Sequence, residues 1–290
     1  MARTVNEGFE ELVRRLIPTE AQREAGASHR ASVRSALEAK FQVNNFFETG
    51  SFSHGTGVRN DSDIDALVSI GGDRPDSSAT ALSWVKSALE ARFPRTDVVI
   101  RRPAVVIKFA GGYETWEVIP GFITGLGAKD HYVYRIPEPG TTSDWIYSAP
   151  KEHLNYVNES NTKPSKGDAK KLVRLLKAWK YYCNVPVSSF YLEMRAAQYI
   201  RKQETYIHVY DLCYLLEELQ GHSLADMNDP SELTSRFRAC SSAANRTDAL
   251  SKLSTAATRA RKALDAYRKD DFDTAFSYLD LLFGDNFPAR

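Results

Sequence analysis

Apolar side chains recur at two different spacings along this chain, and the change in spacing predicts its secondary structure. Residues 4–17 show helical spacing, and a second helix is expected to end near Phe41. Alternating or continuous apolar runs then predict strands. The expected strands cover 64–70, 97–101, 104–109 and 115–119, the last ending at Pro120, with a helix over 78–93, a short strand or helix end over 43–48 and a hairpin turn at Gly111-Gly112.

Helical spacing returns after Gly167 and continues to the end of the chain, with breaks expected near Pro186, Gly221, Pro230 and Gly284. Residues 121–149 are rich in glycine, proline and aromatic residues, which predicts an irregular crossing between two parts of the molecule. The expected fold class is therefore α+β. A lobe of residues 1–150 holds a small mixed sheet, and a helical lobe of residues 151–290 follows it.

The charge balance and the cysteines narrow the possible partners and location. The 290 residues carry 38 Lys and Arg against 37 Asp and Glu, a net charge of +1. A protein that grips a long duplex usually has a basic stripe, so no nucleic-acid partner is expected. No apolar run is long enough to cross a bilayer, so no membrane association is expected either. The 3 cysteines form no CxxC pair, which favours a reducing, cytoplasmic location.

Candidate chemistry is concentrated in residues 50–68, GSFSHGTGVRNDSDIDALV, where a turn rich in glycine and serine leads into an apolar strand. Side chains two residues apart share a face of a strand, so Asp63 and Asp65 point the same way and Ile64 points into the core. Two adjacent carboxylates repel each other unless a cation lies between them, and their hard oxygens suit Mg²⁺. The glycine N–H groups and the hydroxyls of Ser51 and Thr56 are suited to hold a triphosphate close by.

An Asp-x-Asp pair alone is more often a solvated turn, and a turn rich in glycine and serine is also common. Here the turn, a short polar insert and the acidic strand occur together at fixed distances. This joint pattern resembles the nucleotidyltransferase superfamily related to DNA polymerase beta. It looks most like the bacterial cyclic-oligonucleotide synthases, the cGAS/DncV-like nucleotidyltransferases. The resemblance implies a polymerase-beta-like nucleotidyltransferase lobe, with Gly50 and Ser51 in the nucleotide-binding turn.

The family places a third metal-binding carboxylate on a strand after a hairpin, and here that position is Glu117 in the segment TWEVIP. The family more often has Asp there, so this chain departs from the pattern. The alternative is a strand-edge glutamate that faces water. The resemblance therefore implies that Asp63, Asp65 and Glu117 are catalytic and bind two Mg²⁺ ions, or Mn²⁺ in their place.

A second set of motifs lies in the helical lobe, where RLLKAWK followed by SSFYLE resembles the family's signature. The resemblance implies that Lys177 and Ser189 contact the donor triphosphate, with Arg174 as a further candidate. Ser189 is also expected to be the N-cap of the helix that follows Pro186. His54 occupies a position that the family lets vary, and it is expected to be exposed to solvent.

The resemblance implies a template-independent enzyme that makes a cyclic di- or trinucleotide second messenger from NTPs. It also implies a role in bacterial anti-phage signalling through a downstream effector that recognises the product. The alternatives are a linear oligonucleotide synthase, a CCA-adding or other terminal nucleotidyltransferase, and a non-catalytic relative that binds nucleotide or a protein. The intact acidic triad argues against the non-catalytic relative, and the length, without an added RNA-binding region, argues against CCA addition.

Overall fold

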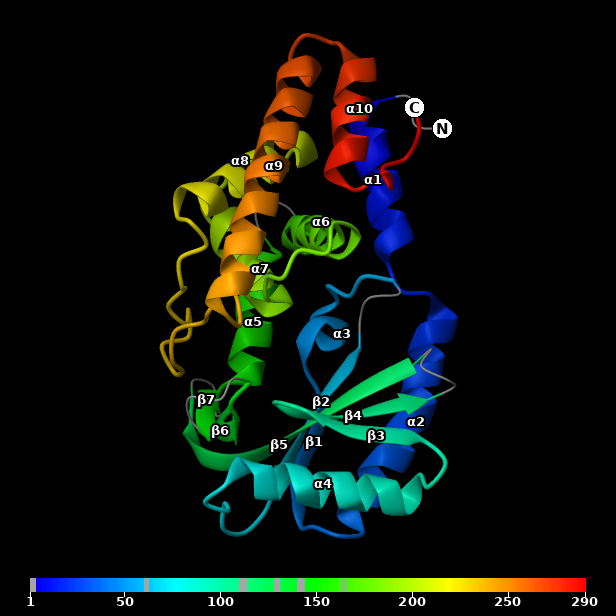
Figure 1. Cartoon of the computed structure of the whole chain (residues 1–290), viewed down its shortest axis with the longest axis vertical. Coiled ribbons are helices and arrows are strands. Elements are labelled where there is room, and N and C mark those ends of the chain that lie inside the picture. Colours follow the sequence, from blue (N-terminus) through cyan, green and yellow to red (C-terminus); the bar gives the residue numbers. More distant parts are fainter. Residues whose placement is uncertain are drawn as a thin grey trace.

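A group of helices stands above a twisted sheet in the computed structural model of the chain (Figure 1). The structure describes residues 4–59, 63–109, 114–127, 131–139, 144–162, 164 and 166–290, without the side chains of residues 21–23 and 25–28. The expected turn at Gly111-Gly112 lies outside the described residues.

The helices are α1 Val5–Leu16, α2 Glu20–Glu38, α3 Gly50–His54, α4 Ser78–Arg92, α5 Pro150–Ser160, α6 Asp168–Tyr182, α7 Ser189–Ile200, α8 His208–Gly221, α9 Ala243–Tyr267 and α10 Phe272–Leu282. The strands are β1 Val43–Glu48, β2 Ile64–Ile70, β3 Asp97–Arg101, β4 Ala104–Phe109, β5 Glu114–Leu126, β6 Tyr132–Pro137 and β7 Trp145–Ser148.

The sheet is mixed, and its strand order is β1-β2-β5-β4-β3. Only the β2–β5 pair among the described ladders is parallel, and it lies in the middle of that order. One face of the sheet packs against α2 and α4, whose apolar side chains share a buried cluster with alternate residues of the strands. Ile64, Ala66 and Val68 point into this cluster, so the odd-numbered residues of β2 face the other side. The α+β class with a small mixed sheet is confirmed.

The predicted end of a strand at Pro120 is wrong, because β5 continues to Leu126. Up to Val118 the strand pairs with β4, and from Phe122 it pairs with β6. Pro120 lies between the two ladders, so neither depends on the N–H that proline lacks. The irregular crossing predicted for 121–149 is wrong for the same reason. Two hydrogen-bonded strands, β6 and β7, extend the sheet there.

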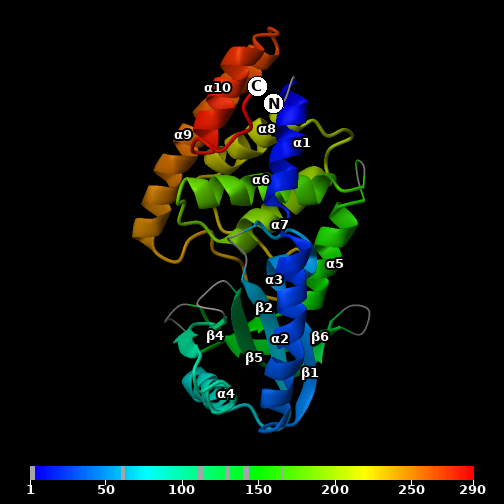
Figure 2. The ribbon, with the colours of Figure 1, turned by 90° about the vertical axis from the view of Figure 1, so that its right-hand side faces the viewer.

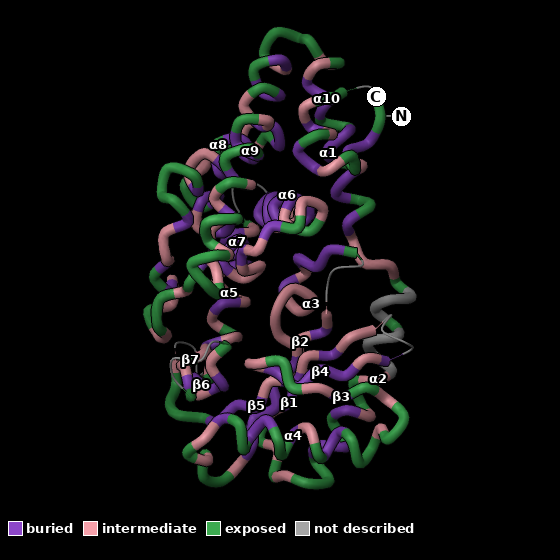
Figure 3. Tube along the Cα trace, viewed as in Figure 1, coloured by how far each residue is buried: buried purple, intermediate pink, exposed green. Residues whose placement is uncertain are grey.

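The N-terminal helices connect the two regions of the molecule. Figure 2 shows α1 beside the upper helices and α2 along the sheet. Phe9, Leu12 and Leu16 of α1 lie in the same buried cluster as Leu172 and Trp179 of α6. Most of the core therefore lies in a helical cluster and a sheet cluster, as the buried segments in Figure 3 indicate, and a third, smaller cluster joins Leu67 of β2 to Tyr134 and Ile136 of β6. A division of the chain at residue 150 stays a prediction, and it would separate α1 from the helices with which it shares a buried cluster.

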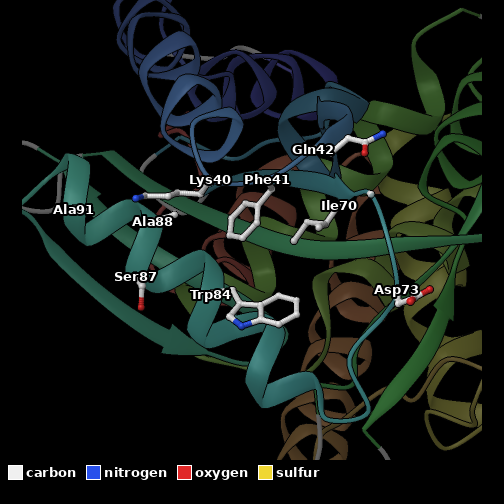
Figure 4. Close-up of a pocket in the computed structure, with 10 residues that line it drawn as sticks. Lys40, Phe41, Gln42, Ile70, Asp73, Trp84, Ser87, Ala88 and Ala91 are labelled. Atoms are coloured by element: carbon white, nitrogen blue, oxygen red, sulfur yellow. The ribbon is translucent and has the colours of Figure 1, made fainter.

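None of the helices in the described part of the chain is long and apolar enough to cross a membrane. A surface cavity of about 660 Å³ lies between α4, the segment 40–42 that precedes β1, and the end of β2 with the residues that follow it (Figure 4). Phe41, Ile70 and Trp84 line its apolar part, and Trp84 is 40% exposed. Ile70 ends β2, at the opposite end of that strand from Asp63 and Asp65. The cavity is therefore separate from the carboxylates.

Candidate active site

The predicted carboxylates meet on the two central strands of the sheet. Because β2 and β5 are parallel, their register places Asp65 directly beside Glu117. Asp63 precedes the first residue of β2 and lies within hydrogen-bonding contact of the Glu117 carboxyl group. Trp116 and Val118 are fully buried on the opposite face. The structure thus brings the predicted triad together on the face of the sheet that α2 and α4 leave uncovered.

The surroundings of the triad oppose its ionisation. Burial raises the pKa of Asp65 to about 8, and the charges of Glu117 and Asp63 act in the same direction. Burial also raises the pKa values of Asp63 and Glu117, and Arg101 partly offsets this for both. Arg101 Nη1 lies 3.6 Å from Glu117 Oε1 on the exposed side of the site. The triad therefore has an excess of negative charge that the neighbouring cation offsets only in part.

These residues fit a divalent cation by their chemistry. Three half-buried carboxylates with hard oxygen donors, close to one another and without sufficient positive charge, favour a small cation. Among the described residues, no three His, Cys, Asp or Glu side chains already form a metal-binding group. Mg²⁺ commonly binds through one or two carboxylates and completes its coordination with substrate phosphate oxygens and water.

The turn rich in glycine and serine folds back on Asp65. Gly50 has φ +60°, and a Cβ there would lie 1.9 Å from Asp65 Oδ2, so no other residue fits without moving that carboxylate. The Thr49 N–H donates to the Asp65 carbonyl over 2.8 Å. Residues 50–54 form the short helix α3, and Gly55, with φ +64°, ends it. The Thr56 N–H then donates to the Ser51 carbonyl over 2.9 Å, which closes the turn.

Lys177 reaches this turn from α6, but its ammonium already has partners. Its Nζ donates to Thr56 Oγ1 over 3.0 Å and to Glu193 Oε2 over 2.6 Å. The other oxygen of Glu193 lies 2.6 Å from His54 Nδ1. The exposed fractions of His54, Lys177 and Glu193 are only 3%, 3% and 2%. The prediction that His54 is exposed is wrong, because α3 turns its side chain toward α7 rather than toward solvent.

Two further cations of α6 face the same turn. The Arg174 guanidinium donates to the carbonyl oxygens of Gly55 and Gly57, so it holds the backbone of the turn. Lys170 is half-buried one helical turn earlier, and its Nζ lies 3.6 Å from the position that a Cβ on Gly55 would take. Burial lowers the pKa of Lys170, and the neighbouring Arg174 charge adds to the effect. No hydrogen-bond partner for the Lys170 ammonium occurs among the described residues.

Ser189 begins α7, but it is not the N-cap. The cap is Ser188, whose Oγ accepts from the Tyr191 N–H over 3.3 Å. The prediction was wrong by one residue because two serines stand in succession and either can cap a helix. The Ser189 hydroxyl therefore has no capping role, and it lies at the start of the helix that carries Glu193.

Sequence reasoning missed four side chains that the structure places at or behind the site: Lys170, Arg101, His54 and Glu193. Lys170 could have been found, because Lys170, Arg174 and Lys177 follow the i, i+4, i+7 spacing of one helix face. The contact between His54 and Glu193 spans 139 residues. No local pattern indicates such a pair.

Comparison with known protein families shows to which family the chain belongs. The family described as Second Messenger Oligonucleotide or Dinucleotide Synthetase domain, SMODS, matches residues 3–161. The matched segment is more than half of the 290 residues. The chain belongs to the SMODS family. The resemblance drawn from residues 50–68 is thereby confirmed, and so is the expectation of a nucleotidyltransferase that synthesises second-messenger nucleotides.

Several solved structures share the fold of this SMODS protein. The E. coli MS115-1 CdnC structure with ATP has a TM-score of 0.77 at 16% identity, covering 98% of this chain and 99% of that one. Bradyrhizobium diazoefficiens CdnG with GTP has a TM-score of 0.74 at 16% identity, covering 96% and 95%. Elizabethkingia meningoseptica CdnE, a cyclic dinucleotide synthase, has a TM-score of 0.65 at 21% identity, covering 86% and 96%. A comparison with curated proteins gives no match.

Proposed function

We propose that this protein joins NTPs, without a template, into a cyclic di- or trinucleotide second messenger. The observation that carries the proposal is the juxtaposition of Asp65 and Glu117 on parallel central strands, with Asp63 beside them and the Gly50 turn folded onto Asp65. Hard oxygen donors thus lie next to a turn whose backbone, hydroxyls and lysines suit a triphosphate. Membership in the SMODS family supports the same chemistry.

Each residue has a distinct role in this proposal. Asp63 and Asp65 would hold Mg²⁺, with Glu117 as a further ligand on the side of the acceptor hydroxyl. Bound there, Mg²⁺ would lower the pKa of that hydroxyl and neutralise charge on the α-phosphate and on the pyrophosphate leaving group. Glu117 also accepts the hydroxyl proton as the oxygen attacks in line. The donor phosphates would lie along the turn, where Ser51, Lys177, Ser189 and the backbone near Gly50 would bind them, while Arg174 holds the backbone of the turn.

The same proposal extends to the biological setting. A cyclic nucleotide acts through a downstream effector that recognises it. We propose that this enzyme and such an effector act in anti-phage defence in the bacterial cytoplasm. A linear oligonucleotide synthase or a terminal nucleotidyltransferase is the second candidate, because it would use the same triad. The two candidates differ in their products, since a linear product keeps a terminal phosphate and a cyclic one does not.

The test is an incubation of the purified protein with all four labelled NTPs and Mg²⁺, followed by phosphatase treatment and mass spectrometry. We expect a phosphatase-resistant product that forms without added nucleic acid and is absent with the variant Asp63→Asn/Asp65→Asn. A product that loses terminal phosphates to phosphatase and has the mass of a linear oligonucleoside afterwards would indicate linear synthesis, and label released entirely would indicate that no NTPs were joined. Activity that requires added tRNA or duplex would overturn the proposal of template-independent synthesis.

A further inference from the structure

Four side chains form a buried ion cluster behind the nucleotide-binding turn: His54, Thr56, Lys177 and Glu193. They come from the end of α3, the turn that follows it, α6 and α7. One oxygen of Glu193 accepts from Lys177 and the other contacts His54, each over 2.6 Å. The Glu193 carboxylate therefore links His54, at the end of α3, to Lys177 of α6.

The cluster ties the position of the turn to the helices. Charges buried to this degree are costly unless each is paired, and removing one partner leaves the other uncompensated. If residues 54–56 moved away from α6 and α7, Glu193 would lose His54 and Lys177 would lose Thr56. Movement of the turn would also displace Gly50, whose missing Cβ leaves the space that Asp65 Oδ2 occupies. One contact set thus orders both the turn and the carboxylate beside it.

The cluster also leaves Lys177 with one hydrogen to donate. An ammonium group carries three N–H donors. Two point to Thr56 and Glu193, which aligns the group relative to the turn. No third partner of this ammonium occurs among the described residues, so the remaining donor is left for a phosphate oxygen, and holding the group in place beforehand lowers the entropic cost of binding.

We propose that His54 and Glu193 are positioning residues, which hold residues 50–58 and the Lys177 ammonium in the arrangement that receives the nucleotide triphosphate. This inference rests on the proposed function, because it assumes that the turn binds nucleotide. It assigns to His54 a role in substrate affinity although His54 is buried and is not one of the three carboxylates of the triad. It makes affinity, rather than the chemical step, the property that the cluster controls.

The test compares His54→Phe, which keeps a ring but loses the contact to Glu193, with His54→Asn, whose amide nitrogen can take the place of Nδ1. Three quantities are measured in Mg²⁺: the KM for NTP, the Kd of a non-hydrolysable NTP by calorimetry, and hydrogen exchange of the amides of residues 50–58. For His54→Phe we expect KM and Kd to rise at least about tenfold, kcat to change less than KM, and exchange at Gly55 and Thr56 to accelerate. His54→Asn should restore most of the affinity.

His208→Phe serves as the matched control. His208 is also 3% exposed and its Nε2 lies 3.0 Å from Glu10 Oε1, but this pair joins α8 to α1, away from the turn. The control should lower the melting temperature and leave KM, Kd and exchange at residues 50–58 unchanged. An equal rise in KM for His208→Phe would overturn the inference, since general destabilisation would then explain both variants.

The remaining outcomes separate the inference from the proposed function. If wild-type protein binds NTP and His54→Phe matches it in Kd and in exchange, the inference alone fails. If His54→Asn behaves like His54→Phe, the hydrogen bond to Glu193 is not what matters, and the positioning role is again overturned. If the wild-type protein binds no NTP, the proposed function and the inference fail together.

Discussion

At the scale of single residues, the site depends on where a side chain is absent as much as on where one is present. Gly50 is required on two grounds: its φ of +60° disfavours other residues, and a Cβ would occupy the space of Asp65 Oδ2. Glu117 is the residue that departs from the family's commoner Asp, and the register of β2 and β5 places it directly beside Asp65. Glu117 has one methylene group more than Asp, and its backbone lies level with that of Asp65 on the neighbouring strand.

A prediction at this scale concerns Glu117. Glu117→Gln keeps the shape but cannot accept the proton or bind a cation as strongly, so kcat should fall at least about 10²-fold. The affinity for a non-hydrolysable NTP should hardly change, because charge on the attacking oxygen develops only in the transition state. Steady-state rates and calorimetric titration measure the two effects. Glu117→Asp should keep part of the activity. A Glu117→Gln variant that turns over like wild type would show that Glu117 is only a strand residue.

At the scale of elements, one face of α6 points toward the turn of residues 50–58. The residues next to that face point toward other helices. Arg174 and Lys177 contact the turn, and Lys170 lies over Gly55. Lys171, the next residue, points to α1 instead, where its Nζ donates to Glu10 over 2.6 Å. Lys170 therefore faces the turn, whereas Lys171 links α6 to α1.

This difference gives a prediction with an internal control. The Lys170 ammonium has no partner among the described residues, so it is available to a phosphate oxygen, and a charge-assisted hydrogen bond contributes about 1.5 kcal/mol or more. Lys170→Ala should therefore raise the KM for NTP roughly tenfold. Lys171→Ala should leave KM unchanged, because its partner is on α1. Equal KM values for the two variants would remove Lys170 from the site.

The elements near the triad were largely predictable from the sequence, and the contacts behind it were not. Strand β2 and helix α4 follow from local apolar spacing, and both appear at the predicted residues. Through Pro120, β5 stays paired with β2 on one edge and changes its partner from β4 to β6 on the other, which no local pattern shows. The triad could be predicted because its pattern resembles that of a known family, and its catalytic role stays a prediction. His54 could not, because its burial depends on Glu193, 139 residues away.

At the scale of the whole molecule, two cores meet at the nucleotide-binding turn, and the buried ion cluster is part of their connection. Burial opposes ionisation of Glu193, but Lys177 and His54 outweigh it and hold its pKa well below the usual value of 4.5. A lowered acid pKa stabilises the fold at pH values above the unfolded pKa. This contribution is lost as the pH falls through the lowered folded-state value.

The expected consequence is a pH-dependent difference in the free energy of unfolding between wild type and Glu193→Gln. Denaturant unfolding from about pH 7.5 to about pH 3.5 should show a constant advantage of wild type above about pH 5, on the order of 3–5 kcal/mol, and a smaller one below pH 4.5. Glu217→Gln is the control, because Glu217 pairs with Arg261 at the surface and such pairs contribute about 1 kcal/mol or less. An advantage that grows as the pH falls would contradict the assignment of the cluster.

The most direct test of the account is a crystal structure of the protein with Mn²⁺ and a non-hydrolysable NTP, in which anomalous scattering locates the metal ions. We predict Mn²⁺ peaks within about 2.0–2.3 Å of carboxylate oxygens of Asp63 and Asp65, with Glu117 as a ligand on the acceptor side. The triphosphate should lie along residues 50–58, with a phosphate oxygen in contact with Lys177. Metal peaks away from the triad, or a triphosphate bound elsewhere with the triad unoccupied, would contradict the account.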